Sequence, residues 1–382
     1  MWFFTEDQRL LQKSVRDFAQ SVLAPKIEYL DEVEGFDRGY FKGMADLGLL
    51  GITAPEEYGG AGMGCVAATI AMEEMGAVDA STTLSYLAHS ILTVNNLAVN
   101  GSEAQKKKYL PKLISGEWIG GMAMTEPGAG SDALAMRTRA VKKGDKYILN
   151  GTKMFITNAV IGDLFYVYAR TGEGRNEIST FLVESGFPGF KMGRKLKKMG
   201  MRASPTGELI FENCEVPAEN LVGKEGDSVR HMLKNLDIER ITISGISLGL
   251  GRASIEAAAK YAKERTQFGQ PIASFQMIQS MLAEDQTAYD SAAALCYNVA
   301  QEWDTGKLEG KASRSASAKV KFGCATMATK VALDAIQILG GYGYTKEFPV
   351  ERYMRDAKLM EIGAGTNEMM KVLIAREVLG DL

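Results

Sequence analysis

The sequence predicts an α+β fold, mostly α, in three parts: a helical N-terminal domain at 1–120, a β-barrel-like middle domain at 121–228 and a helical C-terminal bundle at 229–382. Two observations predict this order. Apolar residues recur at helical spacing in the first and last parts, whereas short β-branched and aromatic runs separated by turn residues fill the middle. A chain of 382 residues with 46% hydrophobic residues can bury a core of this size.

The N-terminal part opens on a helix-start signal. Thr5 and Gln8 have the spacing of a capping box, ahead of an apolar stripe that includes Val15. Helical patterns continue to about residue 120, interrupted by the glycine-rich stretch 58–64. This stretch follows no clear strand and lacks the dinucleotide-binding spacing, so we expect a loop. His89 lies in an apolar helical run, where a histidine is more often a hydrogen-bonded core residue than a catalyst.

The middle part has the pattern of antiparallel strands. Runs rich in β-branched and aromatic residues at 164–168, 179–183 and 208–211 alternate with glycine, proline and asparagine. A basic run at 195–198, followed by Arg202, is expected to be a solvated loop, because charge runs are weak evidence for a polyanion site.

After Ser228 the helical period returns, with interruptions at 269–271 and 340–341, which favours a four-helix antiparallel bundle. Near the end, the segment 355–368 places Gly363, Ala364 and Gly365 between two helical runs. Such a break brings bare backbone close to a ligand or another chain, or is an ordinary helix-to-helix turn.

Charge and composition exclude several classes of function. The net charge of −3 leaves no electrostatic footprint for nucleic acid or an anionic membrane. Four scattered cysteines and two histidines argue against a metal site or a disulfide framework and favour a reducing compartment. We expect no membrane-spanning segment and no targeting signal, as in a bacterial cytoplasmic protein or a processed protein of the mitochondrial matrix.

The helix after Ser228 carries two charges on its apolar face. At 100° per residue, Glu239 and Arg240 fall in the stripe formed by residues such as Met232 and Ile243. Adjacent helical residues do not face each other, so each charge needs a partner elsewhere. The alternative is that they reach a subunit interface or extend to solvent along the surface.

Four motifs then resemble the acyl-CoA dehydrogenase family: 124–132, 264–269, 337–343 and 355–368. The resemblance covers essentially the whole chain. It implies that family's three-domain fold, FAD as cofactor, an acyl-CoA substrate, electron-transfer flavoprotein as acceptor and a homotetramer built as a dimer of dimers. Contacts with FAD across a subunit boundary would require at least a dimer.

The commonest members of the family carry their catalytic glutamate where this sequence has Ala364. The isovaleryl type has a small residue there and a glutamate in a Leu-Asp-x-Glu-Arg context, which residues 236–240 match. The resemblance thus implies that Glu239 is the catalytic base and that the N–H of Ala364 binds the thioester oxygen beside a flavin ribityl hydroxyl. The small side chains at 363 and 364 would suit a branched or bulky acyl group.

Other site residues are also implied by resemblance alone. Those expected at the flavin ring are Met122, Met124, Thr125, Phe155, Ile156 and Thr157, with Phe155 the weakest because an aromatic residue in a β-segment is usually core. Those expected at the pyrophosphate, adenosine or phosphates are Arg265, Gln276, Gln337, Gly340, Gly341, Thr366 and Asn367. Those expected on the substrate side are Ser131, Asp237, Arg240, Gly363 and Arg230, although Arg230 is equally compatible with CoA, an acyl carboxylate or solvent.

Two further readings stay open. An enoyl-CoA reductase runs the same chemistry backwards, and a non-catalytic flavoprotein is suggested by Ala364. An oxidase is disfavoured, because the larger acyl-CoA oxidases carry an extra C-terminal domain. The acyl group itself, whether branched, cyclic, aromatic or straight, is not decided by the sequence.

Overall fold

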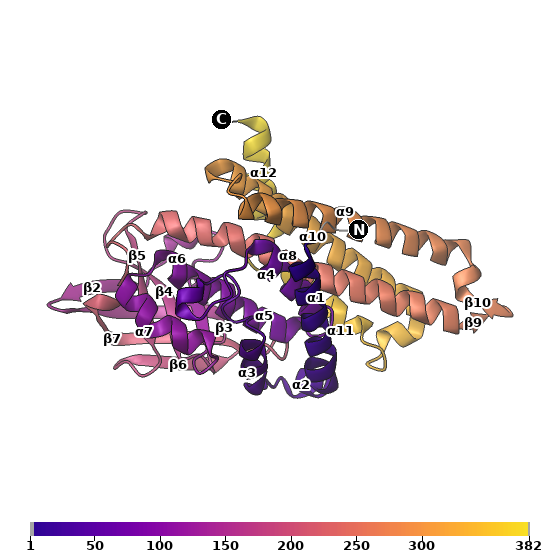
Figure 1. Cartoon of the computed structure of the whole chain (residues 1–382), viewed down its shortest axis with the longest axis horizontal. Coiled ribbons are helices and arrows are strands. Elements are labelled where there is room, and N and C mark those ends of the chain that lie inside the picture. The colour runs from indigo at the N-terminus through magenta and orange to yellow at the C-terminus, as the bar shows by residue number, and fades with distance from the viewer. Residues whose placement is uncertain (1–3, 381–382) are drawn as a thin grey trace.

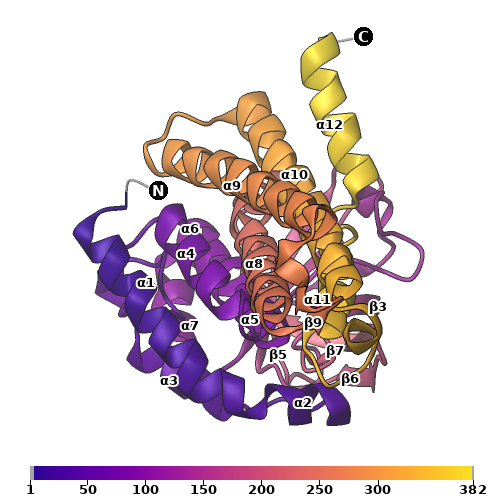
Figure 2. The ribbon, with the colours of Figure 1, turned by 90° about the vertical axis from the view of Figure 1, so that its right-hand side faces the viewer.

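The computed structural model describes residues 4–380, which form helical, sheet and helical regions in that order (Figures 1 and 2). The mostly helical α+β class is therefore confirmed. Residues 1–3 of the expected N-terminal domain and residues 381–382 of the expected C-terminal bundle lie outside the described residues.

The N-terminal region starts at the predicted capping box. The Thr5 hydroxyl accepts from the Gln8 N–H at 3.2 Å, and the Gln8 side chain accepts from the Thr5 N–H at 3.0 Å. The glycine-rich stretch is a loop, as expected, between a short 3₁₀ turn and α4. The helices of this region are α1 (Glu6–Phe18), α2 (Ile27–Val33), α3 (Gly39–Asp46), α4 (Cys65–Gly76), α5 (Ala80–His89), α6 (Asn96–Asn100) and α7 (Glu103–Ile114).

His89 is a hydrogen-bonded core residue, as predicted. Its Nδ1 accepts from the Gly120 N–H at 2.9 Å, so its Nε2 is the nitrogen that donates to the Leu113 carbonyl at 3.1 Å. Burial lowers the pKa of His89 to about 3, so the imidazole stays neutral. The residue ties α5 to α7 and to the first strand.

The strands between residues 4 and 380 form one eight-stranded sheet and a separate hairpin. In the large sheet most neighbours are antiparallel, as expected, but β1 pairs with β4 in parallel, and β2 makes one parallel residue pair with β4. A parallel pair needs a long connection along the chain. The connection from β1 to β4 contains β2 and β3. The sheet strands are β1 (Gly120–Ala123), β2 (Arg139–Lys143), β3 (Lys146–Thr157), β4 (Leu164–Arg170), β5 (Ile178–Glu184), β6 (Phe190–Lys195), β7 (Thr206–Pro217) and β8 (Leu221–Val222).

The C-terminal region is built on α8 (Ser228–Glu264), a helix of 37 residues. In Figure 1, α8 runs from the sheet to the hairpin of β9 (Thr266–Gln267) and β10 (Gln270–Pro271) at the opposite end of the molecule. Both views show α12 projecting away from the rest of the chain. The other helices are α9 (Gln276–Asp304), α10 (Gly310–Leu339), α11 (Val350–Met360) and α12 (Asn367–Leu379).

One segment of this region is long and apolar enough to cross a membrane. It comprises α10 with the 3₁₀ turn that follows, Gly310–Tyr344, and it passes the test by length and composition only. Half of its most apolar window is buried within the protein, and the core helix of a soluble protein passes the same test. Length and composition alone are weak evidence for a span.

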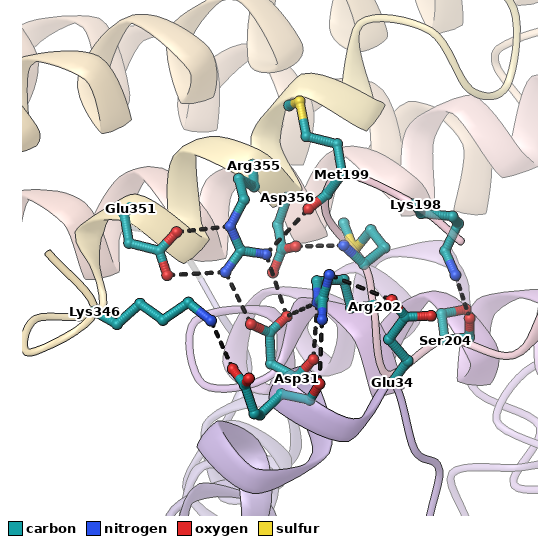
Figure 3. A network of polar contacts seen from close by, with 12 residues as sticks. Asp31, Glu34, Lys198, Met199, Arg202, Ser204, Lys346, Glu351, Arg355 and Asp356 are labelled. Atoms are coloured by element: carbon teal, nitrogen blue, oxygen red, sulfur yellow. Dashed lines mark hydrogen bonds and ion pairs between the residues drawn. The ribbon is translucent and has the colours of Figure 1, made fainter. Parts of the chain in front are cut away.

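A network of ion pairs joins the three regions (Figure 3). The Arg355 guanidinium of α11 donates to both carboxylate oxygens of Asp31 in α2, to both of Glu351, and to the Met199 carbonyl. Arg202 donates to the Asp31 carbonyl at 2.8 Å and forms an ion pair with Glu34 at 3.3 Å.

The loop at 199–204 is seated tightly on α11. A Cβ added to Gly200 would lie 2.2 Å from the Arg355 carbonyl oxygen, so only glycine fits there. The sequence predicted that the neighbouring basic run is a solvated loop, and this is wrong for Lys198. Its side chain is half-buried and donates to the Ser204 carbonyl at 2.9 Å. Lys195, Lys198 and Arg202 thus donate to backbone carbonyls within the protein, whereas Lys197 is exposed.

Candidate active site

Glu239 is a buried carboxylate without a partner. It lies in α8 and is only 6% exposed, and its Oε2 accepts no hydrogen bond from the residues that the structure describes. Burial raises the pKa of Glu239 to about 7, an effect that the nearby charges of Arg240 and Lys321 oppose. A buried acid that titrates near neutral pH is suited to accept a proton from a bound molecule.

Arg240, the next residue, has its partners within the protein. Its Nη1 donates to Asp237 at 3.3 Å, one turn earlier on the same helix, and its Nε donates to the Ala364 carbonyl at 3.3 Å. The Asp237 carboxylate also accepts from Ser313 and Ser317 of α10. Both residues, which the resemblance puts on the substrate side, therefore make structural contacts that fix the surroundings of Glu239.

Ala364 lies in the predicted break between α11 and α12. Its φ of +54° is in the left-handed region, and among the residues of the described chain none accepts a hydrogen bond from its N–H. The contact with Arg240 places this segment beside the helix of Glu239. The structure thus brings a free backbone donor and an unpartnered carboxylate to the same region.

Two of the segments expected at the flavin ring lie side by side. The Met154 N–H donates to the Thr125 carbonyl at 2.9 Å, and Lys153, fully buried, donates to the Met124 carbonyl and the Glu126 carboxylate at 2.9 and 2.8 Å. Phe155 is 66% exposed with a φ of +60°, so it is not a core residue of the sheet. The remaining candidates are Met122, Thr157 and the buried Ile156.

At the start of α12, Thr366 is the N-cap and accepts from the Met369 N–H at 3.3 Å. Asn367 is 7% exposed and uses both ends of its amide inside the protein: Oδ1 accepts from Lys321 at 3.2 Å and Nδ2 donates to Thr326 at 3.3 Å. These contacts fix the carboxyl end of the Ala364 segment.

A second site lies at the other end of α8. A cavity of about 620 Å³ is lined by Arg265, Gly340 and Gly341, and the guanidinium of Arg265 lies 5.7 Å from the centre of the Tyr342 ring. At about 1.5 Å per residue, the helix separates Arg265 from Glu239 by roughly 39 Å. The structure therefore does not bring these residues to Glu239 within one chain.

The other candidates, except Gly363, lie outside both groups. Gln276 and Gln337 are exposed on α9 and α10 and do not line the cavity. Arg230 is exposed in the first turn of α8, and Ser131 is exposed in the turn after β1. Gly363, in the Ala364 segment, would keep ordinary van der Waals distance to Leu359 if it carried a Cβ.

The sequence reasoning missed Lys321, which is 2% exposed on α10. The signal was available, because Lys321 shares a helical face with the buried residues Ser317, Cys324, Ala325 and Ala328. The same test that singled out Glu239 would have found it.

Three family models match consecutive parts of the chain: "Acyl-CoA dehydrogenase, N-terminal domain" at residues 5–117, "Acyl-CoA dehydrogenase, middle domain" at 121–214 and "Acyl-CoA dehydrogenase, C-terminal domain" at 227–379. The chain belongs to the acyl-CoA dehydrogenase family. The resemblance seen in the four motifs is thereby confirmed, and the chain is a flavoprotein oxidoreductase of this family.

Similar proteins within the family are named for branched and general acyl groups. The chain is 46% identical to mitochondrial isovaleryl-CoA dehydrogenase of Oryza sativa subsp. japonica, over 98% of this chain and 92% of that protein. It is 43% identical to an acyl-CoA dehydrogenase of Bacillus subtilis (strain 168), over 98% and 99% of the two chains.

Solved structures share the whole fold. A chain of the structure described as "Electron transferring flavoprotein of Acidaminococcus fermentans: Towards a mechanism of flavin-based electron bifurcation" superposes with a TM-score of 0.96 at 42% identity, with 100% of both chains covered. A glutaryl-CoA dehydrogenase of Mycobacterium smegmatis in complex with FADH2 has a TM-score of 0.93 at 30% identity, covering 99% of this chain and 96% of that one.

Proposed function

We propose that this enzyme catalyses the FAD-dependent α,β-dehydrogenation of an acyl-CoA thioester with a short branched or bulky acyl group. The observation that carries the proposal is that the buried carboxylate of Glu239, whose Oε2 has no hydrogen-bond partner among the described residues, and the free N–H of Ala364 lie in one region, where Arg240 donates to the Ala364 carbonyl. The high identity to isovaleryl-CoA dehydrogenases supports the acyl class.

In this mechanism the Glu239 carboxylate accepts the α-proton of the thioester, so the Cα–H bond breaks and an O–H bond forms on the acid. The Ala364 N–H donates to the thioester oxygen, where negative charge develops as the proton leaves. Arg240 fixes the position of the Ala364 segment relative to α8, because it donates to the Ala364 carbonyl. Bound FAD supplies the acceptor for the β-hydride.

The residues of the structure fit FAD. Phe155 is an exposed aromatic in a left-handed conformation next to the paired segments of Thr125 and Met154, where a planar ring can pack against it. Thr125 and Thr157 offer polar groups there. At the far end of α8, Arg265 and the exposed backbone of Gly340 and Gly341 suit a pyrophosphate.

The test is anaerobic bleaching of the oxidised flavin with a panel of acyl-CoA thioesters. We expect isovaleryl-CoA and other short branched thioesters to bleach the flavin faster than straight chains of equal carbon number. No bleaching with any thioester would support a non-catalytic flavoprotein. Turnover only with enoyl-CoA and a reductant would support the reductase.

The separation along α8 supports an assembly of several subunits. Because Arg265 lies roughly 39 Å from Glu239 in its own chain, we propose that it serves the FAD of a neighbouring subunit. The projecting α12, with Val378 and Leu379 exposed, offers further surface for subunit contact. We expect a homotetramer built as a dimer of dimers. A flavin-saturated monomer in light scattering would contradict this.

We also propose electron-transfer flavoprotein as the acceptor, supported by the likeness to a chain of a structure described by that name. Four free buried thiols, Cys65, Cys214, Cys296 and Cys324, suit a reducing compartment such as a bacterial cytoplasm or the mitochondrial matrix.

A further inference from the structure

Lys321 is a buried cation with a single neutral partner. It is 2% exposed in the middle of α10, and its ammonium donates to the Asn367 side chain at 3.2 Å. No carboxylate of residues 4–380 forms an ion pair with it. An ammonium group taken out of water is costly unless other charges compensate it.

The opposite charge lies on the facing helix. Glu239 of α8 is also buried, its Oε2 has no hydrogen-bond partner among residues 4–380, and α8 and α10 pack along one another. The two charges do not bond to each other, yet each acts on the other: Lys321 favours the ionised form of Glu239, and Glu239 favours the ionised form of Lys321. In a poorly solvated interior such an attraction is felt beyond hydrogen-bond distance.

Lys321 also reaches the segment of Ala364. Its acceptor Asn367 begins α12, and the Asn367 N–H donates to the Glu361 carbonyl at 2.9 Å, which closes the loop that contains Ala364. Arg240 holds the same loop at the Ala364 carbonyl. The loop is thus attached at two points, one on α8 and one on α10.

We propose that Lys321 is a positioning residue for the reaction: its buried ammonium keeps Glu239 in the ionised form that proton removal requires, and its bond to Asn367 anchors the Ala364 loop. This inference rests on the proposed function of Glu239. Lys321 itself need not touch the substrate.

The charged and titratable groups around the pair come from several elements. Glu239 interacts electrostatically with Arg240 on its own helix, with Lys321 on α10 and with Tyr168 on β4. Lys321 faces Arg240 and Glu239 on α8, Glu361 after α11 and Glu368 on α12. Because burial lowers the pKa of Lys321 to about 8, its charge is present at pH 6 and largely lost at pH 9.

The experiment is the pH dependence of flavin reduction in the FAD-loaded enzyme, in single turnover with a saturating thioester that bleaches the wild type. Lys321→Met removes both the charge and the bond to Asn367, whereas Lys321→Gln removes the charge but keeps a side-chain donor. In both variants we expect the acid limb of the pH–rate profile to move to higher pH by about one unit. At pH 6 this shift lowers the rate of flavin reduction roughly tenfold. Above pH 8 the loss should largely disappear.

Lys319→Met is the matched control, because Lys319 lies on the same helix but is half exposed and paired with Glu377. Its pH profile should match the wild type. A second readout, infrared titration of the Glu239 carboxyl assigned with Glu239→Gln, should show the same upward shift in Lys321→Met without turnover.

A purely structural role for Lys321 predicts a different outcome: altered thermal stability or FAD retention with an unmoved acid limb. That result in either variant would overturn the inference and leave the proposed function intact. If instead none of the thioesters tested bleaches the flavin of the wild type, the proposed function fails. The reaction that Lys321 would serve then fails with it.

Discussion

Glu239→Gln is expected to retain FAD and bind acyl-CoA but to lose flavin reduction by about 10³-fold or more. General-base roles are commonly worth about 10²–10⁴ in rate, and the neutral amide cannot accept the α-proton. The substitution is nearly isosteric, and Oε2 has no hydrogen bond to lose, so folding should be spared. Stopped-flow bleaching with isovaleryl-CoA measures the loss.

The wild-type pH profile belongs to the same prediction. Since burial raises the pKa of Glu239 to about 7, the reactive ionised form is lost as pH falls through about 7, and the rate of flavin reduction should fall with it. Near-normal bleaching by Glu239→Gln, with this pH dependence retained, would show that Glu239 is only a packed carboxylate.

A second substitution sharpens the test. Ala364→Glu in the Glu239→Gln background returns a carboxylate to the position used by the commonest family members, on a backbone that already accepts a Cβ at a φ of +54°. We expect partial recovery with short straight acyl chains. Bulky acyl groups should not recover, because the new side chain occupies their space.

Arg355→Met is expected to lower the free energy of unfolding by about 3 kcal/mol. The change leaves Asp31, which is 7% exposed, without its two-point partner and detaches α11 from α2 and from the Met199 carbonyl. Arg202, 3.7 Å from Asp31, compensates only in part. Urea unfolding at fixed protein and FAD concentrations measures the change.

The matched control is Lys346→Met, which removes another cation of the same network (Figure 3). Lys346 and its partner Glu32 are 68% and 65% exposed, so we expect almost no change in the free energy of unfolding. Equal losses in the two variants would show that the network has no special role in joining the regions.

The order of regions was predictable from the sequence because hydrophobic periodicity reports burial directly. The capping box at Thr5 and the break around Ala364 followed from local rules that tertiary contacts did not override. The parallel pairing of β1 with β4 was not predictable, because strand neighbours far apart in sequence leave no local signal.

The candidate site was predictable only in part. Helical projection placed Glu239 and Arg240 on a buried face, but Arg240 takes its carboxylate partner from Asp237 on its own helix, where an outside partner was anticipated. The sequence does not tell which of the two charges stays unpaired. This depends on side-chain geometry, which is set only when α8, α10 and the Ala364 loop pack together. The contacts of Lys195 and Arg202 were hidden for the same reason, since their acceptors, the carbonyls of Glu34 and Asp31, lie far away in the sequence.

The length of α8 keeps the effects of substitutions at its two ends separate. The residues beside Glu239 and those around Arg265 share one rigid helix yet are separated by roughly 39 Å. Substitutions that far apart usually act additively. We therefore expect substitutions around the proposed site at Glu239 to change the acyl preference without disturbing the segment around Arg265.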